Sequence, residues 1–118
     1  MKISIKRAYE DVASGDGYRV LVDRVWPRGR SKEDLALDEW ARDIAPSVKL
    51  RKWFGHDPKC GKRFVECYCT ELESPEHVER LQALLAASGK RSITLIYSAK
   101  GEAHNQAVVL QEILSRMT

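Results

Sequence analysis

The stretch Tyr18-Arg19-Val20-Leu21-Val22-Asp23 decides the fold of this chain. Its core, Val20-Leu21-Val22, is apolar at three consecutive positions and rich in β-branched residues. Neighbouring residues of a strand point to opposite faces, so a strand with this pattern is buried on both sides. The stretch therefore predicts a central strand in a sheet that is covered by helices.

Two other stretches have strand patterns. Residues 2–7 alternate polar residues with Ile3 and Ile5, which is typical of a strand with one buried face. Residues 92–98 carry four large apolar side chains and predict a second buried strand, namely Ile93, Leu95, Ile96 and Tyr97.

Helical patterns lie between and after these strands. The sequence Ser74-Pro75-Glu76 has a capping serine, a proline at the first helical position and an acid beside the positive end of a helix. It predicts a helix to about Ser88, with an apolar face of Val78, Leu81 and Leu85. Pro46 fits the first turn of another helix, which ends near Gly55. Further helices are predicted from Lys59 to Leu72 and from His104 to Met117. The segment from Ser31 to Ile44 has both turn and helix signals, so its secondary structure is not predicted.

The alternation of strands and helices predicts an α/β fold, with a partly parallel sheet and flanking helices. A length of 118 residues suits one small domain and is too short for two with separate cores. We therefore expect a single domain over residues 1–118.

Composition excludes several protein classes. The chain is 43% hydrophobic and 31% charged, as in an ordinary globular protein. No apolar run approaches the roughly 20 residues that cross a bilayer, so we expect no membrane association. The first residues lack the apolar stretch of a secretory signal, which predicts a cytoplasmic protein. Three cysteines, Cys60, Cys67 and Cys69, do not make a disulfide framework and are expected to be reduced thiols.

Basic residues gather in the N-terminal half. The net charge is only +3, but residues 1–63 hold 15 Lys and Arg against 10 Asp and Glu, which gives +5. The density is highest in residues 24–30, where Arg24, Arg28 and Arg30 occur without an acid. Proline and glycine in this stretch prevent a regular helix, so it is predicted to be a basic loop.

In open α/β sheets, ligands bind at the loops that leave the carboxyl ends of the strands. Two loops qualify, after the strands at residues 18–23 and 92–98. If these strands are neighbours, the two loops face one crevice and can receive a phosphate or carboxylate. The alternative is that the basic side chains are only solvated. The candidate ligand-binding residues are Arg24, Arg28, Ser98, Lys100 and Asn105.

The sequence does not decide whether the protein is an enzyme. Asp23 is the candidate carboxylate, and His56 or His104 is the candidate proton carrier. We predict no metal site, because Cys67 and Cys69 would lie about 200° apart around a helix and so could not converge with Cys60. No cofactor is predicted.

Several short stretches together resemble the YeaO-like family, domain of unknown function 488. They are residues 21–29 (LVDRVWPRG), Trp40, residues 45–47 (APS), residues 50–58 (LRKWFGHDP), residues 97–100 (YSAK) and residues 104–107 (HNQA). The resemblance implies a small bacterial or archaeal cytoplasmic α/β protein with no established activity. Gly61 and Gly101 depart from the family pattern, which usually has Trp and an acid there.

Three functions follow from these observations. The leading hypothesis is the binding of an anionic, phosphate-bearing small molecule or nucleotide at the carboxyl ends of the strands. The second is a nucleic-acid-binding module that uses the basic N-terminal half with Trp26. The third is a protein-interaction domain without a ligand. Oligomeric state is not indicated by the sequence.

Overall fold

Strands and helices alternate along the chain, which confirms the α/β fold class. The computed structural model describes residues 2–54, 61–89, 91–98 and 105–117. Its strands are β1 (Ile3–Arg7), β2 (Tyr18–Leu21), β3 (Glu39–Trp40) and β4 (Ile93–Tyr97). Its helices are α1 (Lys32–Leu35), α2 (Val48–Phe54), α3 (Gly61–Leu72), α4 (Pro75–Ser88) and α5 (Gln106–Met117), with short 3-10 turns at Ser14–Asp16 and Arg42–Ile44.

The strands form one sheet in the order β1-β4-β2-β3, and each described neighbour pair is parallel. The sheet was predicted to be partly parallel, and within the described residues it is parallel throughout. The predicted central strand β2 and the predicted buried strand β4 hold the two interior positions. Helices supply the crossovers that parallel neighbours require.

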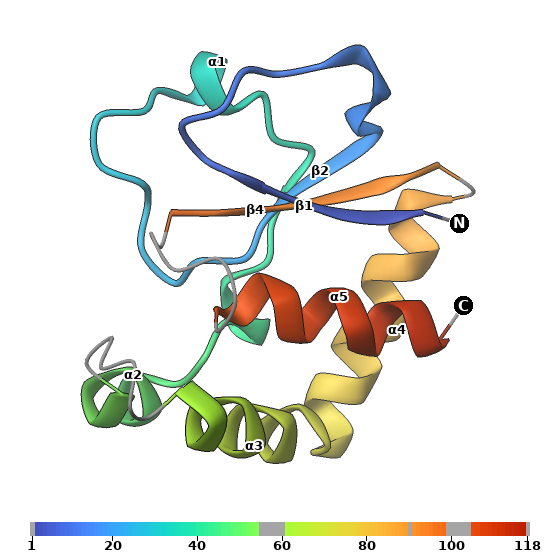
Figure 1. Cartoon of the computed structure of the whole chain (residues 1–118). Coiled ribbons are helices and arrows are strands. Elements are labelled where there is room, and N and C mark those ends of the chain that lie inside the picture. The colour runs from blue at the N-terminus through green and yellow to red at the C-terminus, as the bar shows by residue number, and fades with distance from the viewer. Residues whose placement is uncertain (1, 55–60, 90, 99–104, 118) are drawn as a thin grey trace.

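The sheet is covered on both faces, as its apolar strands predict. Figure 1 shows α2, α3, α4 and α5 on one side of the sheet and α1 with its flanking loops on the other. Along β4, Ile93, Leu95 and Tyr97 belong to the core beneath the helices. Ile96, between them, belongs to a smaller cluster on the α1 side with Leu35. This period of two explains why β4 is apolar at every position except Thr94.

Two helix details correct the sequence prediction. In α4 the buried residues are Leu81, Leu84 and Ser88, whereas Val78 is exposed, so the buried stripe is rotated from the predicted one. Pro46 lies before α2 instead of in its first turn. The reason is that the Ser47 hydroxyl accepts a hydrogen bond from Leu50 N–H at 3.1 Å and so acts as the helix cap.

The α4 cap is as predicted. Ser74 Oγ accepts a hydrogen bond from His77 N–H at 3.4 Å, and Pro75 occupies the first turn. Gly89 ends the helix with a positive φ of 66°. The segment whose type stayed open contains α1, β3 and a 3-10 turn, with Ser31 capping α1.

Gly17 marks a close backbone approach at the start of β2. Its φ is +67°, and a Cβ at this position would collide with the Ser92 carbonyl. The same carbonyl accepts a hydrogen bond from Tyr18 N–H at 2.8 Å. A residue without a side chain is therefore needed where β2 joins β4.

A buried ion cluster lies on the α1 side of the sheet. The Asp16 carboxylate pairs with Lys6 Nζ at 3.1 Å and with Arg19 Nη1. Arg19 is 3% exposed, and its Nε also donates to Leu35 O at 2.9 Å. Burial by itself would raise the pKa of Asp16, but hydrogen bonds from Ala13 N–H and the two cations outweigh burial and lower it.

Candidate functional site

The carboxyl ends of three strands lie side by side. β4 lies between β1 and β2, with Tyr97 opposite Arg7 and Ile96 opposite Leu21. Because all three strands are parallel, the loops that follow them leave from the same edge of the sheet. The points at which the chain leaves β2 and β4 are therefore neighbours.

Asp23 connects the ends of these two strands. Its side chain is buried, with the residue 6% exposed. One carboxylate oxygen, Oδ2, accepts hydrogen bonds from Ser98 N–H at 2.9 Å and from Ser98 Oγ at 2.6 Å. The other, Oδ1, accepts from the side-chain amide of Gln106, in the first turn of α5. The Asp23 carboxylate thus ties β2 to the end of β4 and to the start of α5.

Arg24 turns away from Asp23 toward α2. The residue is half-buried, and its guanidinium donates from Nε to Pro46 O at 3.1 Å and from Nη2 to Ala45 O at 3.3 Å. Within the part of the chain that the structure describes, Arg24 forms no ion pair with a carboxylate. The main chain before α2 therefore fixes this guanidinium without neutralising it.

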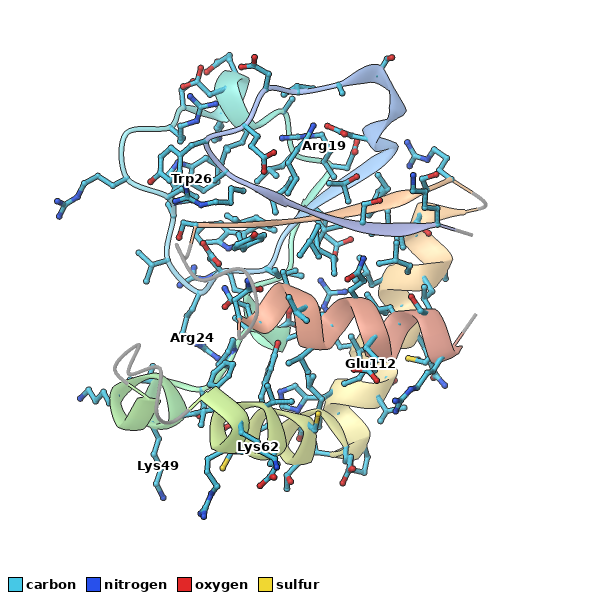
Figure 2. All side chains as sticks on the ribbon, viewed as in Figure 1. Arg19, Arg24, Trp26, Lys49, Lys62 and Glu112 are labelled. Atoms are coloured by element: carbon cyan, nitrogen blue, oxygen red, sulfur yellow. The ribbon has the colours of Figure 1, made fainter. Side chains whose placement is uncertain are left out.

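Arg28 and Arg30 belong to the other side of the sheet. Arg28 is exposed, and its main-chain carbonyl accepts a hydrogen bond from Tyr9 Oη at 3.0 Å. The Arg30 guanidinium donates from Nε to Ala8 O at 2.9 Å. Figure 2 shows Trp26, which precedes these residues, on the opposite side of the sheet from Arg24. The basic loop thus wraps around the sheet edge, and its arginines do not form one cluster.

An exposed aromatic ring lies among the arginines on the α1 side. Tyr9 is 44% exposed. The guanidinium carbons of Arg7 and Arg30 lie 5.2 and 6.0 Å from the centre of its ring. Arg7 also donates from Nη2 to Ser98 O at 3.1 Å, so it connects this ring to the end of β4. These distances are typical of cation–π contacts.

Trp26 is used for packing. Its ring meets Trp40 edge to face, with centroids 5.3 Å apart, and its indole N–H donates to Arg30 O at 2.6 Å. Both tryptophans are half-buried against the smaller core cluster. The Trp40 indole N–H donates to Asp23 O at 2.7 Å. The pair therefore holds the basic loop in place beside the sheet edge.

Asn105 starts α5. It is 3% exposed, and its Oδ1 accepts a hydrogen bond from Val108 N–H at 3.1 Å, as a helix cap does. Three other candidates, His56, Lys100 and His104, lie outside the described residues. Among the predicted site residues, the structure thus brings Asp23 and Ser98 into contact, and it uses Asn105 to start the helix that reaches them.

The thiols Cys67 and Cys69 are free and half-buried in α3. Burial raises the pKa of Cys69, as do the nearby carboxylates of Glu112 and Glu73. Over the described ranges, no three His, Cys, Asp or Glu side chains gather as a metal would require. Cys60 lies outside those ranges.

Two residues at this edge were not among the sequence candidates. Gln106 donates to Asp23, and Arg7 reaches Ser98 O from the end of β1. The available signals were a polar residue in the first turn of a predicted helix and a cation that ends a predicted strand. Neither signal becomes specific until the order of the strands is known.

Helices capable of crossing a bilayer were not found among the residues that the structure describes.

Comparisons with known proteins place the chain in a family. A family model described as "Inactive DUF488-N3 subclade" matches residues 2–118. The chain is 45% identical over 114 residues to the uncharacterized protein YeaO of Escherichia coli (strain K12), which covers 97% of each chain. It is 35% identical over 114 residues to uncharacterized proteins of Mycobacterium bovis and Mycobacterium tuberculosis, which covers 97% of this chain and 94% of theirs. No solved structure matches it. These matches confirm the resemblance seen in the sequence: the chain belongs to the YeaO-like DUF488 family.

Proposed function

We propose that this protein binds an anionic, phosphate-bearing small molecule or nucleotide at the carboxyl edge of its sheet. The observation that carries the proposal is Arg24, a half-buried residue whose guanidinium is held in place by two main-chain carbonyls and is not neutralised by any described carboxylate. A carbonyl fixes a guanidinium but leaves its full charge for another partner. The ligand is expected to supply the missing negative charge.

The chemistry of Arg24 favours a phosphate. A guanidinium has five N–H donors in a planar fork, and Arg24 uses Nε and one Nη2 hydrogen in the described contacts. The remaining donors match the spacing of two phosphate oxygens. Because the rest of the side chain is already ordered by Ala45 and Pro46, little side-chain entropy is lost when an anion binds.

The described part of the site supports ligand binding and assigns no catalytic role to Asp23. A general base must reach the proton that it removes. Both oxygens of Asp23, the candidate carboxylate, accept hydrogen bonds from Ser98 and Gln106, so we assign this carboxylate a structural role. The description of the matching family model as inactive agrees with a binding role. The free thiols of Cys67 and Cys69 support a location in the reducing cytoplasm.

Calorimetric titration with ADP and with inorganic pyrophosphate tests this proposal. Arg24→Gln removes the charge and keeps an amide donor for the carbonyls. Loss of one charge-assisted contact of about 1.5 to 3 kcal/mol should weaken binding roughly 10- to 150-fold. Arg91→Gln is the matched control, because Arg91 also donates to a main-chain carbonyl, Ser88 O at 3.3 Å, but lies before β4 at the opposite edge. Equal affinity in wild-type protein and Arg24→Gln would refute the proposal.

The ring of Tyr9 favours a second candidate function, the binding of single-stranded nucleic acid on the α1 side of the edge. An exposed ring between two guanidiniums offers a stacking surface for a base and cations for the backbone. The salt dependence of binding distinguishes the two candidate functions. Nucleic-acid binding should weaken steeply as salt rises, because counterions are released, whereas binding of one nucleotide at Arg24 should weaken much less. Failure to bind either ligand would favour the protein-interaction hypothesis.

A further inference from the structure

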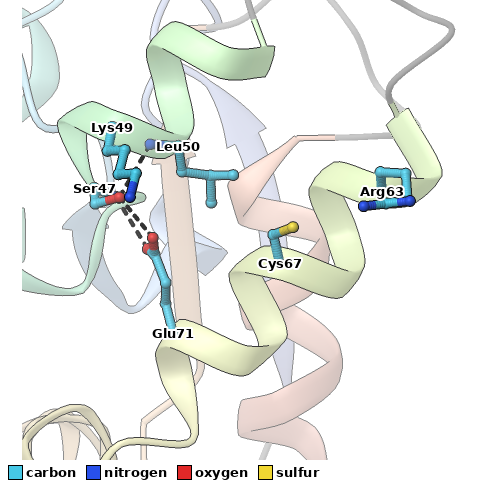
Figure 3. Close-up of a pocket in the computed structure, with 6 residues that line it drawn as sticks. All are labelled: Ser47, Lys49, Leu50, Arg63, Cys67 and Glu71. Carbon is cyan, nitrogen blue, oxygen red and sulfur yellow. Dashed lines mark hydrogen bonds between the residues drawn. The ribbon is translucent and has the colours of Figure 1, made fainter.

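A hollow lies between α2 and α3. Its volume is about 340 Å³, within the range of small-molecule pockets, which begins near 300 Å³. Figure 3 shows the residues that line it, which are Ser47, Lys49, Leu50, Arg63, Cys67 and Glu71.

Internal hydrogen bonds occupy the polar corner of the hollow. The Glu71 carboxylate accepts from Ser47 N–H at 3.1 Å through Oε1 and from Ser47 Oγ at 2.6 Å through Oε2. The Ser47 hydroxyl in turn caps α2 through Leu50 N–H. Glu71 therefore fixes the angle between the two helices, and its oxygens are already engaged.

Two cations line the same hollow. Lys49 and Arg63 are exposed, and neither forms a hydrogen bond or ion pair with a residue in the described ranges. They come from different helices. Arg63 is eight residues from Glu71 on α3, which is about 12 Å along the axis, and Figure 3 shows the two at opposite ends of the hollow. A negative group is therefore best placed near Arg63, away from the carboxylate.

Between Arg63 and Glu71, the lining is apolar. Leu50 is 7% exposed, and Cys67 contributes a half-buried thiol, which behaves as a small apolar group. A purely polar anion would gain nothing from this surface, and a neutral apolar molecule would leave the two cations unused. The lining therefore suits a molecule that has both an apolar body and a negatively charged group.

We propose that the hollow between α2 and α3 binds a small amphiphilic anion, a molecule with an apolar body and a carboxylate, sulfonate or phosphate group. The apolar body lies against Leu50 and Cys67, and the anionic group lies near Arg63, at the end of the hollow away from Glu71. This site is separate from the one proposed at Arg24, and neither needs the other.

Fluorescence titration with anilinonaphthalene sulfonate tests the charge requirement. The neutral analogue phenylnaphthylamine keeps the aromatic body and lacks the sulfonate. The double variant Lys49→Ala with Arg63→Ala should bind the sulfonate about two- to fivefold more weakly, since an exposed charge pair contributes up to about 1 kcal/mol. The matched control is Lys52→Ala with Lys62→Ala, which removes the same charge from exposed positions of the same two helices outside the hollow. Figure 2 shows Lys49 and Lys62 on these helices.

The control should change the affinity by less than about twofold at physiological salt, where exposed charges more than about 8 Å apart are screened. The sulfonate should also bind more tightly than the neutral analogue. Equal weakening by both double variants, or equal affinity for the two probes, would overturn the proposal.

Alkylation of single thiols tests whether the probe binds in the hollow between α2 and α3. One variant keeps Cys67 as its only cysteine, and a second keeps only Cys69, which does not line the hollow. Saturating anilinonaphthalene sulfonate should slow the reaction of iodoacetamide with Cys67 and leave the rate at Cys69 unchanged. An unprotected Cys67, or equal protection of both thiols, would show that the probe binds elsewhere.

Discussion

Arg19 and Arg24 lie five positions apart in the chain and occupy opposite environments. Arg19 is almost fully buried, and its guanidinium pairs with the Asp16 carboxylate beside Lys6. Arg24 is half-buried, and its guanidinium is held by the carbonyls of Ala45 and Pro46. Figure 2 shows Arg19 on the α1 side of the sheet and Arg24 on the α2 side.

The comparison distinguishes a charge that is neutralised within the fold from a charge that an external ligand can neutralise. A carboxylate both orients and neutralises a guanidinium, and a buried pair of this kind is costly to break. A carbonyl orients a guanidinium without neutralising it. The Asp16–Arg19 pair should therefore contribute to stability, whereas Arg24 should contribute mainly to binding. Substitutions at these sites and at reference positions test this division.

Replacing Asp16 by Asn should destabilise the protein by about 3 kcal/mol, because it leaves the buried Arg19 without its counter-charge. Urea unfolding measures the change. Asp11→Asn is the control, since this exposed acid contributes only its main-chain carbonyl to Lys6. A loss below about 1 kcal/mol would mean that the ion cluster does not hold this side of the sheet.

The same cluster predicts a pH dependence. The folded pKa of Asp16 lies below its ordinary value of 3.8, so its contribution to stability is fully present above pH 3.8. That contribution is lost as the pH falls through the lower, folded pKa. The difference in unfolding free energy between wild type and Asp16→Asn should therefore be constant near neutrality and shrink only in strong acid. A difference that shrank between pH 5 and 7 would contradict the assignment.

Asp23 should also act on stability, although it lies at the proposed binding edge. Asp23→Asn puts an amide donor where Ser98 or Gln106 already donates, and we expect a loss of about 2 kcal/mol. Thermal and urea unfolding measure it. Ser98→Ala, which removes only the hydroxyl contact, should cost less. If Asp23→Asn proved as stable as wild type, the carboxylate would be available for chemistry instead.

The helix cap of α4 shows how much one neutral hydrogen bond contributes to stability where neither Arg19 nor Arg24 takes part. Ser74→Ala should lower the free energy of unfolding by about 1 kcal/mol, because His77 N–H loses its acceptor. Ser74→Asp keeps an acceptor and should retain most of the stability. Identical unfolding midpoints for Ser74→Ala and wild type would show that the cap does not stabilise this helix.

The sequence predicted the fold better than the site. The apolar run of β2 and the alternation of strands and helices were sufficient for the α/β class, because burial on both faces is visible in consecutive residues. The contact between Asp23 and Ser98 spans 75 positions and depends on β4 lying beside β2. Strand order is not encoded in any local pattern, so this contact was only a conditional expectation.

The division between Arg19 and Arg24 was not visible in the sequence. Arg19 lies between apolar residues of the stretch 18–23, and Arg24 directly follows this stretch. Residue type alone does not show whether an arginine is held by a carboxylate or by a main-chain carbonyl. An arginine inside the buried strand β2, next to its apolar run, was a usable signal, because a charge at such a position needs a buried partner. The partner, Asp16, comes from the preceding turn.

We infer that the charge of Arg24 is available to an external anion, whereas Asp16 neutralises the charge of Arg19. The most direct measurement is a titration of the protein with inorganic pyrophosphate, followed through the arginine Nε–H signals in a two-dimensional proton–nitrogen NMR spectrum. Arg24→Gln identifies the Arg24 signal, and Asp16→Asn displaces and so identifies that of Arg19. We predict a saturable shift of the Arg24 signal and no shift of the Arg19 signal. An Arg24 signal that stays in place at saturating pyrophosphate, or an Arg19 signal that moves with it, would contradict this account.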